Sequence, residues 1–578
     1  MSNFRETIWC GMEFSRKIKE KIEDGSFREM WQEAKWMFTY IRRYRLIVFI
    51  HILLGVIGTA MSLLSSLAMR MLIDVVTGFQ TGAIWTAAAY MAGMMLGSVA
   101  MQAAASRISA IINIRVQNGI QAEIYDRMLR TDWQALKAFR SGDLINRLNG
   151  DVSAVSSGVT SFLPSFVSGS VQFLGSLIII LCYDPVMALI ALVGAPIYVL
   201  ASRALVKKMR EYNKRMKEIG SQVMSFHEDS FRNLTTIKSF GVMDGFDARM
   251  RNMQSTYRTA MLDYNRFSVI AGLVMSVVGL LISAGCFGWG VYRLWSNAIS
   301  YGTMTMFLQL TNMLRTSFST LIGLVPTAIS ITTSAGRLMA VVELPEEPGA
   351  REMADIPENC SVELRNISFT YSDGEKVLEN VSFSAKPGET IAITGASGEG
   401  KTTIVRIILG LIRPDEGEAV LCGSGTEQTL SASTRRAFAY VPQGNTVLAG
   451  TIADNLRMVK PDASEEEMYE AIRLACADGF IGKLPDGIYS STGEVGSGFS
   501  EGQAQRIAVA RALLQKAPVL ILDEATSALD EVTERKMLDN ICSSGNVKTC
   551  IVITHRPATA EICSKHYVLE GTGIRQVL

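Results

Sequence analysis

Six apolar windows, almost free of charged residues, constrain the fold of this 578-residue chain more than any other feature. They cover residues 46–69, 75–106, 152–183, 185–202, 267–292 and 299–332, and Arg315 in the last window is the single charge within them. About 20 mostly apolar residues cross the ~30 Å hydrocarbon core of a bilayer. Helices buried in a soluble protein can give such a window, but six of them predict a polytopic α-helical membrane domain.

The distribution of Lys and Arg predicts the orientation of these spans, because positive charge is retained on the cytoplasmic side. Residues 107–151 contain seven Lys and Arg and residues 203–266 contain thirteen, whereas the turn at Tyr183 and Asp184 contains none. Both long charged segments and both termini are therefore expected in the cytoplasm. The protein is expected in the cell membrane as a multi-pass protein.

The two charged segments are expected to be helical almost throughout. A helical excursion of twenty or thirty residues in each direction reaches roughly 30 to 45 Å beyond the bilayer. Their tips, predicted near residues 131–139 and 216–226, could dock on another domain. Ahead of the first span, residues 27–40 mix Phe, Trp and Met with charges. They predict a helix in the membrane interface, although an ordinary helix packed on protein remains an alternative.

Overall composition excludes several other classes of protein. The net charge is +1, so no global field indicates nucleic acid as a partner. The nine cysteines contain no C-x-x-C pair, which argues against a zinc or redox site. Residues 1–26 lack the apolar core of a secretory signal and are expected to form a cytoplasmic extension.

The sequence changes character after the sixth window, which defines the expected domains. The membrane domain, including the interfacial helix, is expected over residues 27–340, and an acidic, proline-bearing linker over 341–358. Residues 359–578 then combine alternating strand patterns with short apolar runs, such as those at 389–395 and 517–524, that are typical of buried parallel strands. This part predicts a soluble α/β domain.

Two motifs in the C-terminal domain carry chemistry. Residues 395–402, GASGEGKT, match G-x-x-x-x-G-K-[ST] between a predicted strand and a predicted helix. Such a P-loop wraps backbone N–H groups around phosphate, while Lys401 contacts the β and γ phosphates and Thr402 can bind Mg²⁺. Residues 519–524, VLILDE, end in two acids at a strand's carboxyl edge. Asp523 is predicted to hold Mg²⁺ and Glu524 to polarise the attacking water.

With these motifs the chain resembles an ATP-binding cassette exporter half-transporter of the type IV fold, in which a transmembrane domain is fused to a nucleotide-binding domain. The resemblance extends over nearly the whole chain. Its remaining motifs are FTY, YVPQ, FSEGQAQRIAVARALL, LILDEATSALD and VITH in the second half, and SGDLINRLNGDV and TTIKSFG in the first. It implies an ATPase coupled to transmembrane transport, with ATP and Mg²⁺ as cofactors.

The resemblance also assigns roles to single residues. Tyr371 resembles the aromatic residue that stacks on adenine, although a core tyrosine at a strand end is the alternative. Gln443 is expected to contact Mg²⁺ and the attacking water, and to lie where the cytoplasmic excursions dock on the cassette. Asp530 is expected to act across a dimer, and His555 to donate to the γ-phosphate. The implied catalytic residues are Lys401, Gln443, Glu524 and His555; the nucleotide-binding residues are Tyr371, Gly395, Ala396, Ser397, Gly398, Glu399, Gly400, Lys401, Thr402, Thr403, Gln443, Ser500, Gly502, Gln503, Asp523 and Asp530; and the Mg²⁺ ligands are Thr402, Gln443 and Asp523.

The signature segment departs from the family pattern LSGGQ. Here it reads FSEGQ, so that Glu501 replaces a glycine, while Ser500, Gly502 and Gln503 are retained. In the family this segment clamps the γ-phosphate of ATP that is bound to the opposite chain. A carboxylate pointing inward would repel the triphosphate, so Glu501 is expected to face solvent. A homodimer with two working sites is the favoured expectation, and a heterodimer with one degenerate site stays open.

The resemblance implies ATP-driven export of a hydrophobic or amphipathic substrate (a lipid, peptide or drug-like molecule) by alternating access. An ATP-gated channel or regulator on the same scaffold is the rival class. Polar residues within the spans indicate where a substrate could bind, and the candidates are Gln172, Asn312 and Arg315. An arginine deep in a span normally faces a cavity or a partner. Pairing within a helix interface is nearly as good an explanation for Arg315.

Overall fold

The computed structural model describes residues 26–79, 82–139, 141–371, 374–396, 398–423, 425–444, 446–493, 498–544 and 549–577. It divides into two compact units, which are described separately below. The membrane unit comprises Met1–Ile124 and Ile145–Ala340, and the cassette unit comprises Tyr125–Leu144 and Val341–Leu578. Of the expected N-terminal extension, residues 1–25 lie outside the described residues.

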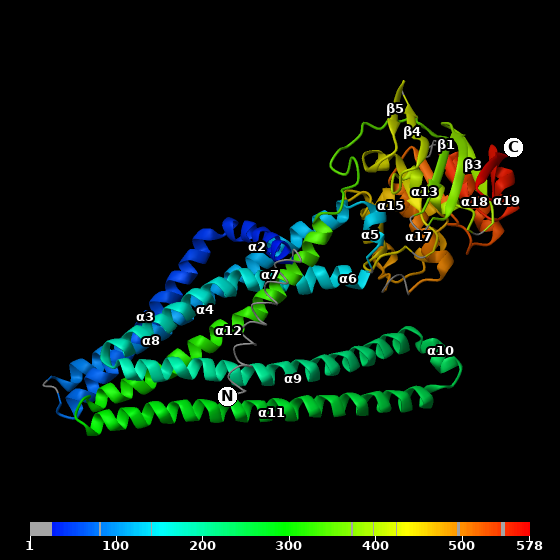
Figure 1. Ribbon diagram of the computed structural model, residues 1–578. Helices are drawn as coiled ribbons and strands as arrows, with labels where there is room; N and C mark the ends of the chain where they lie inside the picture. The colour runs from blue at the N-terminus through cyan, green and yellow to red at the C-terminus, as the bar shows by residue number, and fades with distance from the viewer. Residues whose placement is uncertain are drawn as a thin grey trace. The chain divides into compact units, whose positions relative to one another are not determined.

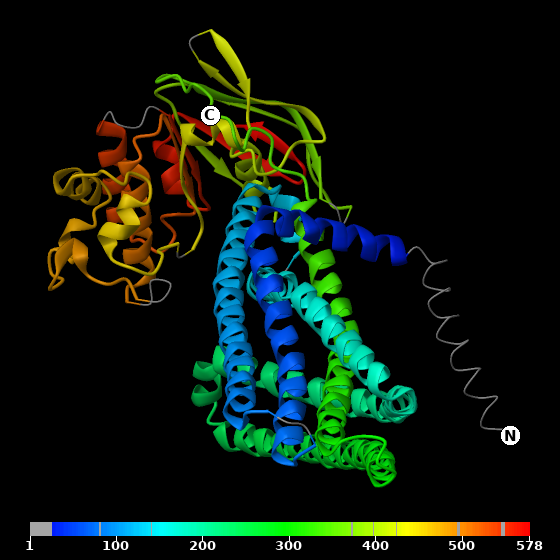
Figure 2. The same ribbon diagram turned by 90° about the vertical axis from the view of Figure 1, so that its left-hand side faces the viewer.

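Long helices build the membrane unit (Figures 1 and 2). Their bounds are α2 Ser26–Arg43, α3 Arg45–Val76, α4 Ile84–Arg130, α8 Leu163–Tyr183, α9 Pro185–Arg232, α11 Met243–Trp295 and α12 Tyr301–Val342. Within the described residues, four helical segments are long and apolar enough to cross a membrane: Arg45–Val76, Ile84–Arg130, Ser141–Tyr183 and Met243–Trp295. The windows at 185–202 and 299–332 lie in α9 and α12, where the side chains of 191–204, 325, 326 and 329 are outside the described residues.

The segment that leads into the third span is helical but irregular. It runs through α6 Ser141–Asn146, the π-helical turn Arg147–Asp151, α7 Val152–Ser157 and a second π-helical turn Gly158–Phe162 before α8. A Cβ atom at Gly158 would lie 2.6 Å from the side chain of Ile331, so glycine lets this segment approach α12 closely. Asp151 is buried and forms an ion pair with Arg337 of α12. The third span is thereby fixed against the sixth.

The turn between the third and fourth spans is held by the carboxylate of Asp184. One oxygen accepts hydrogen bonds from the backbone N–H groups of Val186 and Met187, at 3.0 and 3.1 Å, and so caps the N-terminus of α9. The other accepts from Arg293 Nε at 2.8 Å, at the end of α11. The one cation that follows the fifth span therefore joins the outer ends of α9 and α11.

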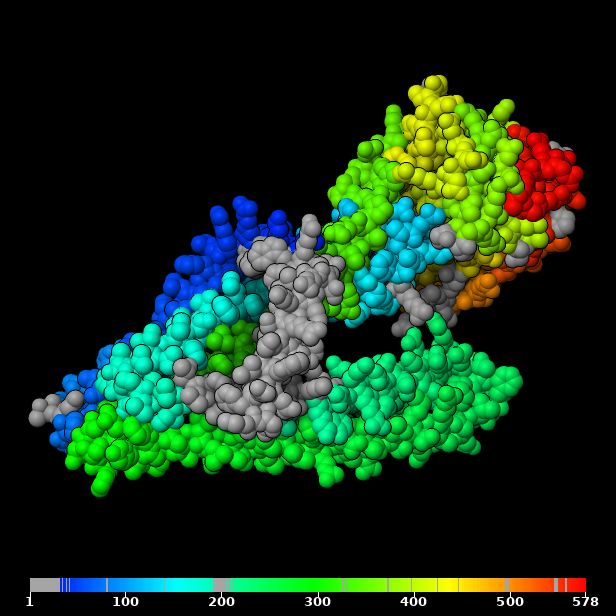
Figure 3. Space-filling view, in the orientation of Figure 1, coloured from blue at the N-terminus to red at the C-terminus, as the bar shows by residue number. Residues whose placement is uncertain are grey.

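Helices α9 and α11 run side by side as a long antiparallel pair, with α10 (Leu234–Ser239) at its far end (Figure 1). The second cytoplasmic excursion therefore reverses after residue 232, and the predicted tip at 216–226 lies inside α9 instead. Gly220 does not end the helix. A Cβ there would lie 3.2 Å from the ring of Tyr257, so glycine lets α11 pack closely. In the space-filling view the coloured atoms of α11 run along the lower edge of the picture, and those of the later part of α9 lie against them at one end (Figure 3).

The predicted interfacial segment at 27–40 is helical and belongs to α2. Its described side chains contact protein as well as forming a free face: Met37 and Tyr40 are each 9% exposed, and the Tyr40 hydroxyl donates to Glu123 Oε1 of α4 at 3.2 Å. Trp36 packs edge-on against Tyr40, with 4.9 Å between ring centroids. Part of α2 thus behaves as the ordinary packed helix that the sequence left open.

Two sheets form the frame of the cassette unit. The strands are β1 Ser361–Thr370, β2 Lys376–Ala385, β3 Thr390–Thr394, β4 Glu416–Gly423, β5 Thr426–Thr429, β6 Phe438–Val441, β7 Val519–Asp523, β8 Thr549–Ile553, β9 Lys565–Glu570 and β10 Gly573–Gln576. The first sheet has the order β2-β1-β4-β5 and is antiparallel, whereas the second has the order β10-β9-β3-β8-β7-β6 with a parallel centre. Every residue of β7 and β8 is buried, as expected for central parallel strands.

Helices cover this central sheet and create two apolar cores. They are α13 Lys401–Ile408, α14 Ile452–Arg457, α15 Glu465–Leu474, α16 Asp478–Ile481, α17 Glu501–Leu514, α18 Glu531–Ser543 and α19 Pro557–Ile562. One core joins α14, α15, α17 and α18 to β7. The other joins α13 to β3 and to the antiparallel sheet. Because β3, β8 and β7 are parallel neighbours, their carboxyl ends lie at one edge of the sheet, where the loops that follow them begin.

The predicted linker is bound to the cytoplasmic end of α4. Arg127 donates to the carbonyl groups of Val342 and Leu344, at 3.0 and 2.9 Å, and forms an ion pair with Glu346. Thr131 and Glu346 form an isolated β-bridge. The connection after α12 is therefore an ordered part of the cassette unit.

Candidate functional site

The P-loop connects β3 to α13, as its sequence predicts. Gly398 and Gly400 have φ angles of 92° and 91°, in the left-handed region that glycine adopts without strain. Lys401 begins α13, and Gly400 directly precedes that helix. Glu399 Oε2 accepts a hydrogen bond from the Ala396 N–H at 2.5 Å. Ser397 lies outside the described residues.

Lys401 is the buried cation of this loop, with 6% of its surface exposed. Its Nζ donates to the carbonyl oxygens of Gly395 and Ala396, at 2.7 and 2.9 Å. Burial lowers the pKa of the ammonium group, and the nearby carboxylates of Glu524, Glu399 and Asp523 oppose that shift. A buried ammonium whose hydrogen-bonding partners are two carbonyl groups and an imidazole is well placed to contact an anion.

A chain of contacts joins four of the predicted catalytic residues. Lys401 Nζ lies 3.2 Å from His555 Nε2, which lies 2.6 Å from Glu524 Oε1. Gln443 Nε2 donates to Glu524 Oε2 at 2.6 Å. His555 Nε2 can either donate to Glu524 or accept from Lys401, depending on the tautomer. The imidazole can therefore serve only one of its two neighbours at a time.

Glu524 has an unusual backbone conformation. Its φ is 49°, in the left-handed region that residues other than glycine rarely adopt. The Glu524 N–H donates to the carbonyl oxygen of Ile553 at 3.0 Å, which fixes the residue after β7 to the end of β8. Such backbone strain persists where the surrounding structure determines it, often at functional sites. Here it directs the carboxylate toward both His555 and Gln443.

Asp523 and Thr402 differ sharply in burial. Asp523 is 4% exposed, and Oδ2 accepts a hydrogen bond from the Tyr440 hydroxyl at 3.2 Å, whereas Thr402 is exposed. Burial raises the pKa of the Asp523 carboxyl. It also raises the pKa of Tyr440, together with the charge of Asp523. A divalent cation would offset the desolvation of this carboxylate.

The available donors fit Mg²⁺ that shares its coordination with a phosphate. Carboxylate, hydroxyl and amide oxygens are present at Asp523, Thr402 and Gln443, and Mg²⁺ bound with substrate phosphates normally uses only one or two carboxylates. Among the described residues no cluster of three His, Cys, Asp or Glu could hold a metal by itself. The oxygen donors at the site therefore fit a cation that takes its remaining ligands from a phosphate.

Tyr371 lies directly after β1 and is fixed by its hydroxyl. That group is 3.1 Å from Thr403 Oγ1 and accepts from Arg406 NH1 at 2.8 Å. Its ring meets Phe369 edge-on, with 4.9 Å between centroids. Packing against the core, the alternative explanation for Tyr371, is therefore observed, and the roles of Tyr371 and Thr403 toward a nucleotide stay predictions.

The first cytoplasmic excursion provides a short helix, α5 (Trp133–Lys137), next to Tyr371. Arg406 lies over the ring of Trp133, 4.8 Å from its centroid, and Lys137 Nζ lies 5.9 Å from the centroid of Tyr371. The predicted docking of residues 131–139 on the cassette is therefore seen beside Tyr371 and α13. It had been expected near Gln443.

The signature segment begins α17. Ser500 is its N-cap, with Oγ accepting from the Gln503 N–H at 3.3 Å, and Gln503 Oε1 accepts in return from the Ser500 N–H at 3.0 Å. Glu501 is exposed, in agreement with its expected position facing solvent. A Cβ at Gly502 would lie 2.9 Å from the carbonyl oxygen of Ala528, so close packing on the segment after β7 requires this glycine.

Asp530 and Arg556 form structural contacts next to the site. Asp530 Oδ2 caps α18 by accepting from the Thr533 N–H at 2.9 Å. Arg556 forms an ion pair with the buried Glu534 of the same helix at 2.5 Å and donates to the Ser527 carbonyl at 2.9 Å. The loop that contains His555 is thereby tied to the segment between Glu524 and Asp530.

The three candidate substrate residues lie in the membrane unit, and only two of them meet. Arg315 NH2 donates to Asn312 Oδ1 at 3.1 Å, and both residues are exposed in this chain. A Cβ at Gly279 of α11 would lie 3.0 Å from Arg315 NH1. Gln172 is half-buried on α8, and among the described residues it forms no hydrogen bond with Asn312 or Arg315.

Sequence reasoning missed several residues that complete the nucleotide site. Tyr440 stands within the quoted motif YVPQ, so its contact with Asp523 could have been anticipated from its position at the end of β6. Arg406 and Trp133 gave no such signal, because residues far apart in the sequence meet there. Glu534 gave none either, since a glutamate in a helix is normally solvated.

Comparison with known proteins agrees with this geometry. Residues 48–318 match the family described as "ABC transporter transmembrane region", and residues 378–527 match the family "ABC transporter". A "Multidrug resistance ABC transporter ATP-binding and permease protein" from Lactococcus lactis subsp. lactis is 26% identical over 535 residues, covering 90% of this chain and 88% of the relative. A "Putative export ATP-binding/permease protein" from Rickettsia bellii is 28% identical over 464 residues, covering 79% and 80%.

A solved structure shares the fold. The "Structure of a bacterial Atm1-family ABC exporter with ATP bound" superposes with a TM-score of 0.77 and 23% identity, covering 93% of this chain and 95% of the other. The predicted fold class, a helical transmembrane domain followed by an α/β ATP-binding domain, is confirmed. The chain belongs to the ATP-binding cassette transporter family, as an exporter half-transporter of the membrane whose cytoplasmic ATP-binding domain is an ATPase coupled to transport.

Proposed function

We propose that two copies of this chain form a homodimer that exports a hydrophobic or amphipathic substrate by alternating access. The single observation that carries the proposal is the contact chain from Lys401 through His555 and Glu524 to Gln443. It brings together a cation for phosphate, a hydrogen-bonding switch, a general base and an amide that can sense the site. All four groups are needed to couple ATP hydrolysis to movement of the membrane helices.

In this proposal the P-loop and Lys401 bind the phosphates, and Tyr371 packs against adenine. Thr402, Asp523 and Gln443 would hold Mg²⁺, which would supply positive charge to the transferring phosphoryl group. Glu524 orients or deprotonates the attacking water, while His555 donates to the γ-phosphate. Release of Lys401 from the carbonyl groups of its own loop accompanies phosphate binding.

The second half of each ATP site is proposed to come from the partner chain. Ser500 and Gln503 stand at the N-terminus of α17, where backbone N–H groups favour an anion. Asp530 is proposed to act across the same interface. Closure of the two cassettes on two ATP molecules then drives the membrane helices, and hydrolysis reopens them. Vesicle uptake against a gradient distinguishes this pump from an ATP-gated channel.

The main test is Glu524→Gln in the protein reconstituted in vesicles. Loss of the base is expected to lower the ATPase rate by about 10² to 10³-fold while ATP still binds. Glu531→Gln is a matched control, because Glu531 is an exposed acid in the first turn of the nearby α18, and it is expected to keep the wild-type rate. Full ATPase activity in Glu524→Gln would refute the assignment of the base.

A complementation experiment tests the shared sites. Lys401→Ala removes the P-loop cation but leaves the signature segment intact, and Ser500→Arg does the reverse. In a Glu524→Gln background, neither variant alone should retain ATP through gel filtration. Co-expressed mixed dimers should retain about one ATP, because one complete site forms from the two chains. A protein that stays monomeric with ATP and Mg²⁺ yet turns over at full speed would contradict the proposal.

A further inference from the structure

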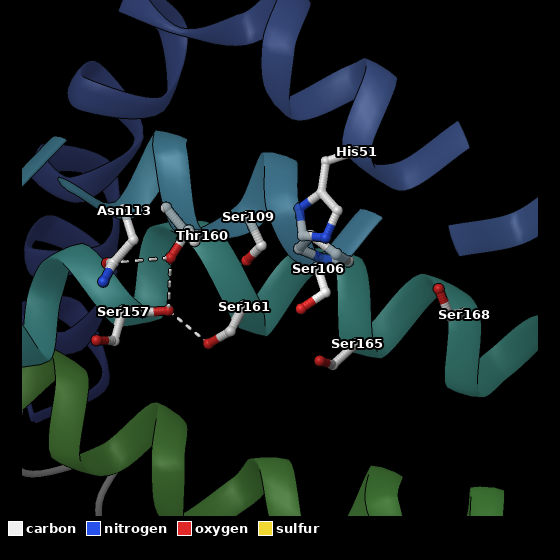
Figure 4. A pocket seen from close by; sticks show the side chains of 11 residues that line it. His51, Ser106, Ser109, Asn113, Ser157, Thr160, Ser161, Ser165 and Ser168 are labelled. Carbon is white, nitrogen blue, oxygen red and sulfur yellow. Dashed lines mark hydrogen bonds between the residues drawn. The ribbon is translucent and has the colours of Figure 1, made fainter. Parts of the chain in front are cut away.

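A polar cavity of about 500 Å³ lies within the membrane unit, between α3, α4 and the segment from α7 to α8 (Figure 4). Nine of its eleven lining residues are polar, and none of the eleven carries a formal charge apart from a protonatable His51. The lining is rich in serine and includes His51, Asn113 and Thr160. We call this space the serine cavity. It is separate from Arg315, Asn312 and Gln172, none of which lines it.

Many polar groups of the serine cavity have no partner inside the protein. Ser106, Ser109, Ser165 and Ser168 form no hydrogen bond with any residue that the structure describes, and the buried Nδ1 of His51 has no partner there either. Serine hydroxyls in membrane helices commonly bond to the preceding turn of their own helix. Ser106 is exposed and the other three serines are half-buried, so their hydroxyls are open to a ligand or water.

Other polar groups are already used, which shows that the cavity is built rather than loosely packed. Asn113 Oδ1 accepts from the hydroxyl of Ser156 at 2.9 Å and from that of Thr160 at 3.4 Å. The Ser157 carbonyl accepts from Ser161 Oγ at 2.5 Å. These contacts fix the walls, and in Figure 4 the ring of His51 extends from α3 toward Ser106. The free hydroxyls therefore come from a rigid frame.

The serine cavity is placed where an exporter receives its substrate. His51 lies six residues after Arg45, the first residue of α3, which is roughly 9 Å along the helix. Ser106 is the last residue of the second apolar window and directly precedes Arg107. Both positions correspond to the cytoplasmic ends of their spans, because the cassette and both long charged segments are cytoplasmic.

We propose that the serine cavity binds the uncharged, hydroxyl- or amide-bearing polar part of an amphipathic substrate as it enters from the cytoplasmic side; this rests on the proposed export function. A charged group would be desolvated here without a counter-ion, and a purely apolar group would leave the hydroxyls unpaired. The volume lies within the range of small-molecule sites. Export of an amphiphile with a sugar-like or amide head fits both conditions.

The test uses the full-length protein in lipid nanodiscs and follows stimulation of its ATPase. The probes are octyl glucoside as a neutral amphiphile, octyl phosphate as an anionic one, and glucose as the head alone, each below its micellar concentration. We expect octyl glucoside to stimulate saturably at lower concentrations than either of the others. Ser109→Ala combined with Ser165→Ala should raise its half-maximal concentration about tenfold, because two hydrogen bonds are lost.

Further variants separate binding from folding. His51→Gln retains a hydrogen-bonding side chain and should raise the half-maximal concentration less than His51→Phe. Ser66→Ala is the matched control on α3, because the Ser66 hydroxyl bonds to its own helix and lies outside the serine cavity, and it should respond as wild type. A photoreactive octyl glucoside should label peptides that contain His51 or residues 106–113, which reports binding without any ATPase reading.

The outcomes that overturn the proposal are distinct from failure of the proposed function. Wild-type half-maximal concentrations in the serine and histidine variants, or labelling elsewhere, would show that the cavity holds water only. Stronger stimulation by octyl phosphate would favour an anion site, and equal stimulation by glucose would favour soluble polyols; either result refutes an uncharged amphiphile. Full ATPase activity in Glu524→Gln would instead refute the function while leaving the labelling result informative.

Discussion

The nucleotide site and the serine cavity use polar residues in opposite ways. In the nucleotide site the reactive groups contact one another: Lys401 reaches His555, His555 reaches Glu524, and Gln443 completes the chain. In the serine cavity the hydroxyls of Ser106 and Ser109 reach no described partner. A site that performs the same reaction in each cycle can fix its groups in advance, whereas a site for a variable ligand leaves hydrogen-bonding capacity free.

The largest expected effect concerns Lys401, the cation of the nucleotide site. Lys401→Ala should lower the ATPase rate by about 10² to 10³-fold, because removal of one preorganised charge-stabilising group costs this much. ATPase assays at saturating ATP measure it. Lys376→Ala is the control, since Lys376 is an exposed residue of β2 that forms an ion pair with Glu379. A less than threefold loss in Lys401→Ala would show that the contact chain does not depend on its cation.

The next effect concerns the ion pair between Arg556 and Glu534, which supports the nucleotide site. Arg556→Ala leaves Glu534, which is 2% exposed, without its cation, although the hydroxyls of Thr526 and Thr559 still donate to it. Because Arg556 itself is partly exposed, we expect a loss of about 2 kcal/mol in the free energy of unfolding of the cassette. For a domain of this size the melting temperature should fall by about 4–8 °C.

A surface pair provides the control for that measurement. Arg575 and Glu570 form an ion pair with both side chains more than 60% exposed, and Arg575→Ala should change the free energy of unfolding by less than about 0.5 kcal/mol. Combining Arg556→Ala with Glu534→Gln should recover part of the loss, since the uncompensated charge is gone. Equal melting temperatures for Arg556→Ala and Arg575→Ala would mean that burial does not distinguish the two pairs.

A smaller effect tests whether the buried carboxylate of Asp523, which the proposed function requires, lowers the stability of the nucleotide-free protein. Burial raises the pKa of its carboxyl, so the folded state binds a proton there more tightly than the unfolded chain does. The stabilisation from the protonated acid is complete below the unfolded pKa of about 4 and is lost as pH rises through the folded pKa. At pH 7 the charge opposes folding.

Asp523→Asn should therefore raise the melting temperature of the nucleotide-free protein by a few degrees at pH 7. The gain should shrink as the pH falls, because the wild-type carboxyl, whose pKa is raised by burial, then takes up a proton. Scanning fluorimetry across this pH range measures both. Asp539→Asn is the control, because Asp539 is exposed on α18 and should show no such pH dependence. A destabilised Asp523→Asn at pH 7 would reverse the assigned sign.

The smallest expected effect concerns Glu501, the acidic departure in the signature. Glu501 is exposed and Ser500 already caps α17, so Glu501→Gly should change the ATPase rate less than about twofold. Ser500→Ala, which removes the cap, should cost about 1 kcal/mol of stability and serves for comparison. An increase in the ATPase rate of tenfold or more in Glu501→Gly would show that the carboxylate weakens the site and would favour the heterodimer.

Contiguous motifs explain how much of the nucleotide site could be predicted from the sequence. Glycines at 395, 398 and 400 and the acids at the end of β7 are specified by local spacing, and the parallel sheet brings their loops together. Arg406 on Trp133 could not be predicted, since the two are on different elements and share no motif. Nor could the end of the second excursion, because no residue before 232 interrupts α9.

The serine cavity could not be predicted for a different physical reason. Its residues come from α3, α4 and the α7–α8 segment, and serine in an apolar window is compatible with helix packing as well as with a ligand. The serines of the third span have both environments: Ser165 and Ser168 line the cavity, whereas Ser176 is fully buried. Only three-dimensional structure separates these two roles of the same residue type.

The clamp between the linker and α4 has a mechanical consequence. Arg127 and Arg130 donate hydrogen bonds to the carbonyl groups of Val342, Leu344 and Ala350. The segment that follows α12 is therefore bound to the last turns of α4. A displacement of the cassette consequently pulls on two membrane helices at once, α12 through the covalent backbone and α4 through arginine. With two attachments, one to α12 and one to α4, the cassette resists rotation about either attachment, so its movement is transmitted to both helices.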